Sequence, residues 1–253
     1  MSDMNINNIG LVLTVVALAL AVWQTWAANR QARALLLISN ALSTKYLGTF
    51  PEYMPYVGNL IERAKRELLI ICTMPTHGVF SVHEMWLSMK HAIEMALLPD
   101  HKVMVSCVFA NAATRRTFLE AQFRVAKADW STWRSNPANA SRLQYFLKKF
   151  GRGGDIQELT FDGFLNLFDS AANEEFTTTY KGAEVLEVNY RPPLYMWVVD
   201  GKEAIFGIST TTPSYIAEAF WTADARLINA LINMHRDCRQ WAQRHGSVSG
   251  ESS

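Results

Sequence analysis

His77 is the side chain whose type and position best suit nucleophilic or acid–base chemistry in this sequence. It follows the apolar run Leu68–Thr73, which has the composition of a strand buried on both faces. Parallel α/β sheets bind ligands at the carboxyl ends of their strands, so this loop is a predicted place for a catalytic residue. His83, Glu84 and Asp200 are the candidate partners of His77. The alternative is an ordinary loop histidine beside an acidic helix N-terminus, and it is favoured because the sequence identifies no paired base.

Basic residues offer two candidate anion sites. Arg115, Arg116 and Arg124 lie on one predicted helix, and Gly151–Asp155 reads GRGGD directly after two lysines. The glycine-rich segment lacks the preceding strand and following helix of a P-loop, so a helix that ends at glycine is the favoured interpretation. A solvated helix face is the more frequent explanation for the arginines, and Arg115 is retained as a candidate ligand-binding residue.

Composition argues against several classes of site. The three cysteines, Cys72, Cys107 and Cys238, show no CxxC or Cys/His ligand spacing, so neither a metal nor a cofactor is predicted. A formal net charge of +1 gives no argument for a nucleic-acid groove. Thirteen Phe and eight Trp indicate a well-filled core rather than a disordered chain.

Helices and strands alternate around His77. The predicted segments are Tyr56–Arg66 (helix), Leu68–Thr73 (strand), Val82–Leu97 (helix), Val103–Phe109 (strand) and Ala112–Val125 (helix, with Asn111 as its N-cap). This rhythm is typical of a parallel α/β unit. Two further helices are expected at Ser141–Phe150 and Phe161–Ala172, after a loop at Trp130–Asn139.

The last third of the chain changes to strands. The predicted strands are Val185–Asn189, Tyr195–Val199 and Glu203–Ile208, followed by a closing helical region over Ile216–Arg244. Asp200–Gly201 separates two of these strands and is the strongest short hairpin signal in the sequence. The predicted fold class is therefore α/β, with a mixed sheet flanked by helices.

The passage LYMWVVDGKEAIFGISTTT and the helix DARLINALINMHRDCRQW after it resemble the C-terminal part of a phospholipase D-like domain. In that superfamily a strand carries His-x-Lys-x4-Asp, a hairpin turns on Asp-Gly, and the next strand ends in Gly-Ser-x-Asn. The resemblance covers Tyr53–Trp241, including the opening strand–helix–strand pattern. It implies one phospholipase D-like domain, a phosphate-containing ligand and, because such domains pair, a homodimer.

The motif positions depart from the superfamily pattern. Counting back from Asp200, Pro193 occupies the histidine position and Tyr195 the lysine position. Ile208 replaces the serine of the second motif, and Ser209 follows one place late. The superfamily histidine attacks phosphorus and the lysine neutralises phosphate oxygens, so the resemblance implies the fold without this chemistry.

The candidate site residues form two sets. The catalytic candidates are His77, Asp200 and Ser209, and the ligand-binding candidates are Tyr195, Lys202, Thr210 and Arg115.

The N-terminal segment predicts a single membrane span. Ile9–Ala28 carries no charge and is long enough for a bilayer core of about 30 Å. Arg30 and Arg33 follow it, which predicts an outer N-terminus and a cytoplasmic C-terminal domain. A buried core helix would carry a polar stripe, and a signal peptide would carry its positive charge before the apolar run.

The predicted organisation is residues 1–28 as tail and transmembrane anchor, 29–52 as juxtamembrane helix and linker, 53–245 as the α/β domain and 246–253 as a flexible tail. Three functions stay open. The first is a membrane-anchored, catalytically degenerate phospholipase D-like module for ligand sensing or protein interaction. The second is an active phosphodiesterase, acting as a phospholipase or nuclease with a non-standard nucleophile such as His77. The third is a structural membrane scaffold. The anchor and the near-neutral charge favour lipid over nucleic acid as a partner.

Overall fold

The computed structural model describes residues 44–151, 153–209 and 217–245. The predicted membrane span Ile9–Ala28, the candidate residue Thr210 and the predicted C-terminal tail lie outside these residues. Within the described ranges, no helix combines the length and the apolar composition that crossing a membrane requires.

One mixed sheet of seven strands has the order β1-β7-β6-β5-β2-β3-β4. The strands are Lys45–Thr49 (β1), Glu67–Cys72 (β2), Met104–Ala110 (β3), Glu184–Val188 (β4), Leu194–Val199 (β5), Glu203–Ser209 (β6) and Ala217–Thr222 (β7). Strands β2, β3 and β4 are parallel to one another, and the other neighbouring pairs are antiparallel. The predicted α/β class with a mixed, helix-flanked sheet is confirmed.

Strand β2 is a continuous apolar run because both of its faces are buried. Leu68, Ile70 and Cys72 pack into the core on one face of the sheet. Leu69 and Ile71 pack into a second core on the other face. Burial on both sides removes the polar alternation that a solvent-facing strand shows.

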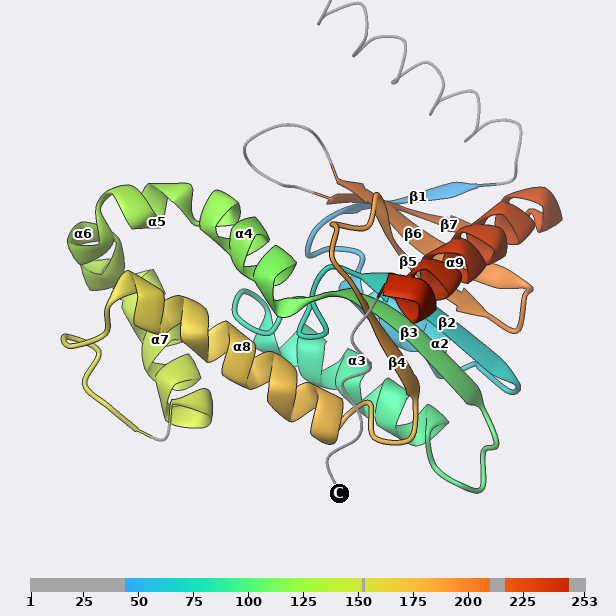
Figure 1. Ribbon diagram of the computed structural model, residues 1–253, viewed down its shortest axis with the longest axis horizontal. Helices are drawn as coiled ribbons and strands as arrows, with labels where there is room; N and C mark the ends of the chain where they lie inside the picture. The colour runs from blue at the N-terminus through green and yellow to red at the C-terminus, as the bar shows by residue number, and fades with distance from the viewer. Residues whose placement is uncertain (1–43, 152, 210–216, 246–253) are drawn as a thin grey trace, which may run out of the picture. The chain divides into compact units, whose positions relative to one another are not determined.

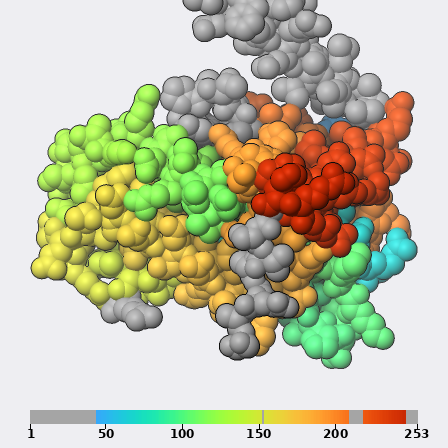
Figure 2. All heavy atoms as spheres, in the orientation of Figure 1, coloured from blue at the N-terminus to red at the C-terminus, as the bar shows by residue number. Residues whose placement is uncertain are grey.

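Helices cover both faces of this sheet (Figure 1). Helix α9 (Ala225–His245) lies across one face, where Ile228 and Leu231 pack against sheet residues. Helices α2 (Met54–Ile61) and α3 (His83–Ala96) pack on the other. Figure 2 shows the face that α9 covers, in red.

A helical lobe connects β3 to β4. It consists of α4 (Ala112–Gln122), α5 (Arg124–Ala128), α6 (Trp130–Ser135), α7 (Pro137–Phe150) and α8 (Phe161–Thr177). Asn111 caps α4 as predicted, because its side chain accepts a hydrogen bond from the backbone of Thr114. Aromatic rings fill the lobe: the Phe164 ring lies 5.3 Å from Phe80 and 5.0 Å from Phe123, centroid to centroid.

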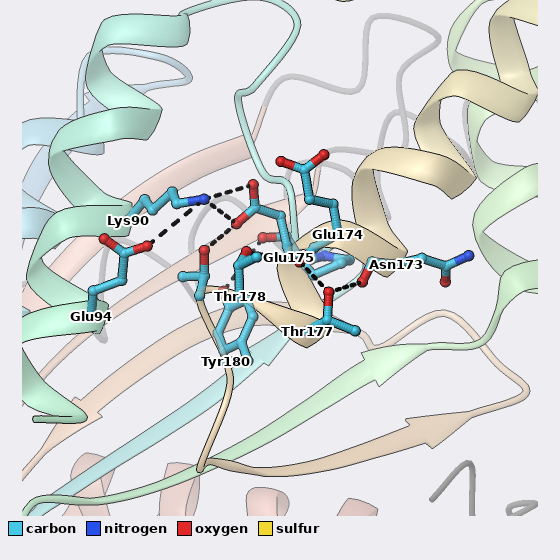
Figure 3. A network of polar contacts seen from close by, with 10 residues as sticks. Lys90, Glu94, Asn173, Glu174, Glu175, Thr177, Thr178 and Tyr180 are labelled. Atoms are coloured by element: carbon cyan, nitrogen blue, oxygen red, sulfur yellow. Dashed lines mark hydrogen bonds and ion pairs between the residues drawn. The ribbon is translucent and has the colours of Figure 1, made fainter. Parts of the chain in front are cut away.

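A fully buried carboxylate joins the lobe to α3 (Figure 3). Glu175 on α8 accepts hydrogen bonds of 3.1 and 3.2 Å from Nζ of Lys90 on α3. The hydroxyl of Thr179 donates to the same carboxylate. An unpaired buried charge is costly, so the Glu175 carboxylate needs the Lys90 ammonium beside it.

Some segments differ from their sequence-based predictions. The predicted juxtamembrane helix and linker at residues 29–52 is wrong at its end, because residues 45–49 form β1 and pair with β7. The sheet therefore includes residues before position 53. The prediction of helix at residues 217–222 is also wrong, because pairing with β6 makes this segment β7. The predicted loop Trp130–Asn139 contains α6 and the start of α7, since Asp129 and Asn136 each cap a new helix.

The predicted hairpin between β5 and β6 is confirmed. Asp200 and Gly201 connect the two strands with φ angles of +53° and +63°. Two-residue turns of this mirror-image type need both φ angles positive, which explains an Asp-Gly pair at this point.

Candidate functional site

The carboxyl ends of β2, β3 and β4 meet at one edge of the sheet, and β5 begins there because it runs antiparallel to β2. His77 lies in the loop after β2, and Tyr195 lies near the start of β5. Their ring centroids are 5.1 Å apart. The structure therefore brings one candidate catalytic residue together with one candidate binding residue.

Aromatic rings surround the half-buried His77, which also lines a cavity. The ring centroids of Phe50 and Trp197 lie 5.1 and 6.0 Å from that of the imidazole. The Tyr53 hydroxyl and Nε2 of His77 share a hydrogen bond of 2.8 Å. Burial lowers the pKa of His77 to about 4, so the imidazole is neutral at pH 7.

The phenols beside His77 are neutral as well. Burial raises the pKa of Tyr53 well above its ordinary value. Burial also raises the pKa of Tyr195, although the nearby Arg191 guanidinium acts in the opposite direction and lowers this pKa. Attack on phosphorus by a histidine needs an unengaged ring nitrogen and a neighbouring cation for the phosphate oxygens. Here Tyr53 engages Nε2 and leaves Nδ1, and the Tyr195 phenol itself supplies no charge beside the imidazole. The Arg191 guanidinium next to Tyr195 is the nearby cation.

A cavity of about 220 Å³ opens beside His77. Its aromatic walls come from the loop after β2 and from the helical lobe: Phe80, Phe118, Phe123, Trp133 and Phe168. Its polar lining includes Thr76, Ser81, Gln122, Asn139, Arg142 and Tyr195. The site is thus an aromatic-walled cavity with polar groups from several elements.

The charge at the cavity is positive. None of the described residues that line it carries a carboxylate, whereas Arg142 contributes a guanidinium. A second guanidinium, that of Arg191, lies 4.8 Å from the ring centroid of Phe118.

Thr76 is 3% exposed, and its hydroxyl has no hydrogen-bond partner among the described residues.

Asp200 and Lys202 lie at the opposite edge of the sheet from His77. The Asp200 carboxylate accepts hydrogen bonds from backbone N–H groups at the entry to β2, including one of 2.8 Å from Arg66. Lys202 is exposed on the same hairpin turn. The predicted grouping of His77 with Asp200 is wrong, because the length of β2 separates them.

Arg115 does not line the cavity beside His77 in the described structure. It is buried and ion-paired to Glu187 on β4, and it donates a 2.7 Å hydrogen bond to the Ala110 carbonyl. Its guanidinium also lies 5.4 Å from the ring centroid of Phe176. This arginine therefore ties α4 to the sheet.

The other predicted residues lie on different elements. Ser209 ends β6 at the same edge of the sheet as the cavity and pairs in register with Ala217. His83 bonds through Nε2 to the Tyr145 hydroxyl on α7, and Glu84 is exposed in the first turn of α3. The helix-end interpretation of the GRGGD segment is confirmed, since Gly151 ends α7.

No protein-family model and no curated protein matches the chain. Solved structures show weak similarity. TrmBL2, an archaeal chromatin protein, is 11% identical with a TM-score of 0.40, covering 92% of this chain and 68% of its own. NucT from Helicobacter pylori is 9% identical with a TM-score of 0.40, covering 78% and 95%. Nuc from Salmonella typhimurium, a phospholipase D family member, is 10% identical with a TM-score of 0.37, covering 78% and 94%. Similarity at this level assigns neither a family nor an activity.

The sequence prediction missed most of the enclosure around His77. Phe50 and Tyr53 fall where a linker was predicted to end, and they meet His77 only through tertiary packing. One signal was available: Tyr195 and Trp197 are two residues apart on a predicted strand and so share a face. Both rings contact His77 on that face.

Proposed function

We propose that this chain is a ligand-binding module, built on a phospholipase D-like domain that lacks the phosphohistidine chemistry of that superfamily. The observation that carries the proposal is the cavity of about 220 Å³ beside a neutral, aromatic-enclosed His77. Such a module serves ligand sensing or protein interaction. The motif positions held by Pro193 and Tyr195 support the loss of the superfamily chemistry.

Residual catalysis by His77 is a weak alternative on energetic grounds. A general acid or base alone contributes about 10² to 10⁴-fold, whereas phosphate-ester hydrolysis needs far larger accelerations. The Tyr53 hydroxyl engages Nε2 of the imidazole. Among the described cations, Arg142 lines the cavity and Arg191 lies beside Phe118 and Tyr195.

The first test is hydrolysis. We expect the purified full-length chain to turn over neither a fluorogenic phosphodiester nor phosphatidylcholine vesicles above background. The matched variant is His77→Ala. Turnover by the parent that disappears in this variant would show an active site rebuilt around His77 and would overturn the proposal.

The second test is ligand binding. We expect members of a small-molecule fragment library to shift the NMR signals of cavity-lining residues such as Thr76 in the full-length chain. A Ser81→Phe variant places a ring in the cavity and should abolish these shifts. Arg236→Gln, on the exposed side of α9, is the control and should bind like the parent. Absence of any fragment bound at the cavity contradicts the proposal.

The membrane anchor and the homodimer belong to the same proposal. A span at Ile9–Ala28 would hold the module at the bilayer, and confinement there raises the effective concentration for pairing. Light scattering of the full-length chain in detergent tests the pairing, and a monomer mass would contradict it.

A further inference from the structure

We propose that the cavity beside His77 selects a planar heteroaromatic ring that bears an anionic group. This inference rests on the proposed ligand-binding function and names the class of ligand.

The walls favour a flat ring. Phe80, Phe123 and Trp133 line the cavity, with the Phe80 ring perpendicular to Phe123 and nearly parallel to Trp133. Both edge-to-face and stacked contacts with a bound ring are favourable arrangements for aromatic groups. An apolar cavity of about 150 Å³ holds benzene, so the larger volume of about 220 Å³ suits a bicyclic ring.

The polar lining favours a ring with hydrogen-bonding atoms. Ser81 and Asn139 add a hydroxyl and an amide to the same lining. A ring N–H or ring nitrogen can pair with the Ser81 hydroxyl and the Asn139 amide, whereas a hydrocarbon ring cannot.

The charges favour an anionic substituent. Arg142 is exposed on α7 and lines the cavity, so a ligand anion at the opening meets its guanidinium without full desolvation. Arg191, stacked on Phe118, adds positive potential through the cavity wall. With no carboxylate among the described lining residues, the local field favours an anion over a cation.

The test compares three probes by calorimetry with the full-length chain in nanodiscs, against empty nanodiscs. Indole-3-acetate has the ring and the charge, indole-3-acetamide has the ring alone, and propionate has the charge alone. We expect indole-3-acetate to bind about tenfold more tightly than the amide, and propionate to show no measurable binding.

Two variants test whether Arg142 causes the tighter binding of the anionic probe. Arg142→Gln should weaken indole-3-acetate binding about tenfold and leave the amide unchanged, because only the acetate meets the lost charge. Arg236→Gln, an equal loss of charge on α9, should change neither affinity.

The outcomes separate this inference from the proposed function. If propionate binds as tightly as indole-3-acetate, or the amide matches the acetate, the ligand class is wrong while the cavity remains a binding site. If none of the probes binds but library fragments do, the same conclusion holds. If neither probes nor fragments bind, the proposed function fails as well.

Discussion

At the scale of single residues, burial decides the behaviour of His77. The imidazole lies among Phe50, Tyr53, Tyr195 and Trp197, where a positive charge loses its hydration. The folded protein therefore binds a proton at His77 only near pH 4, whereas an unfolded chain binds it near the ordinary value of 6.5. Protonation of His77 therefore favours the unfolded state. The contribution of His77 to the unfolding free energy is fully present above about pH 6.5 and is lost as the pH falls toward 4.

We predict that His77→Gln makes the unfolding free energy less dependent on pH. The parent should lose about 3 kcal/mol of unfolding free energy between pH 6.5 and 4 through His77, and the variant should lack this contribution. Urea denaturation at several pH values measures it, with carboxylate effects cancelling between the two proteins.

Tyr53→Phe is the control for the cause. It removes the 2.8 Å hydrogen bond to His77 and keeps the ring that buries it. The pH dependence should persist in this variant. If the pH dependence of stability disappeared in Tyr53→Phe, the hydrogen bond and not burial would be the cause of the lowered pKa of His77.

At the scale of elements, the β5–β6 hairpin depends on its turn. We predict that Gly201→Val lowers the unfolding free energy by more than about 1 kcal/mol, because a β-branched residue resists the φ of +63° found there. Chemical denaturation measures the loss. Gly201→Asn should cost less, since asparagine adopts positive φ more readily. A valine variant as stable as the parent would contradict the turn assignment.

The Lys90–Glu175 ion pair links α3 to α8. We predict that Lys90→Met costs about 3 kcal/mol or more, because it leaves a fully buried carboxylate without its cation. The double variant Lys90→Met/Glu175→Gln should recover most of the loss.

Glu94 provides the control, because its carboxylate is 42% exposed and lies 3.8 Å from the same ammonium. Glu94→Gln should cost less than about 1 kcal/mol. Equal losses from both single variants would exclude a special role for the buried pair.

The sequence identified the elements whose signal is local. The apolar run of β2, the Asn111 cap, the glycine end of α7 and the Asp200–Gly201 turn each follow from a few adjacent residues. Strand β7 could not be identified in this way, because its residues also suit a helix and only pairing with β6 decides between them.

At the scale of the whole molecule, the candidate site was only partly predictable. Position in the loop after a parallel strand singled out His77, and that rule depends only on sheet topology. The enclosure of His77 and the cavity combine residues from β1's neighbourhood, β5 and the helical lobe, whose meeting no local pattern encodes. The motif resemblance placed Asp200 in the catalytic set, whereas the β5–β6 register holds it at the far edge of the sheet.

The orientation of the whole chain leads to the last prediction. Ile9–Ala28 has no charged residue, and Arg30 and Arg33 follow it while the preceding residues contain no Lys or Arg. Positive flanks stay in the cytoplasm, so the residues from position 29 onward should lie inside.

Fusions at the C-terminus measure this orientation. A C-terminal fluorescent-protein fusion should be bright, and a C-terminal alkaline phosphatase fusion should be inactive. Arg30→Gln/Arg33→Gln with Asn5→Lys/Asn7→Lys moves the positive charge to the other flank and should shift chains toward the inverted orientation. An active phosphatase fusion on the unmodified chain would mean that the flanking arginines do not set its topology.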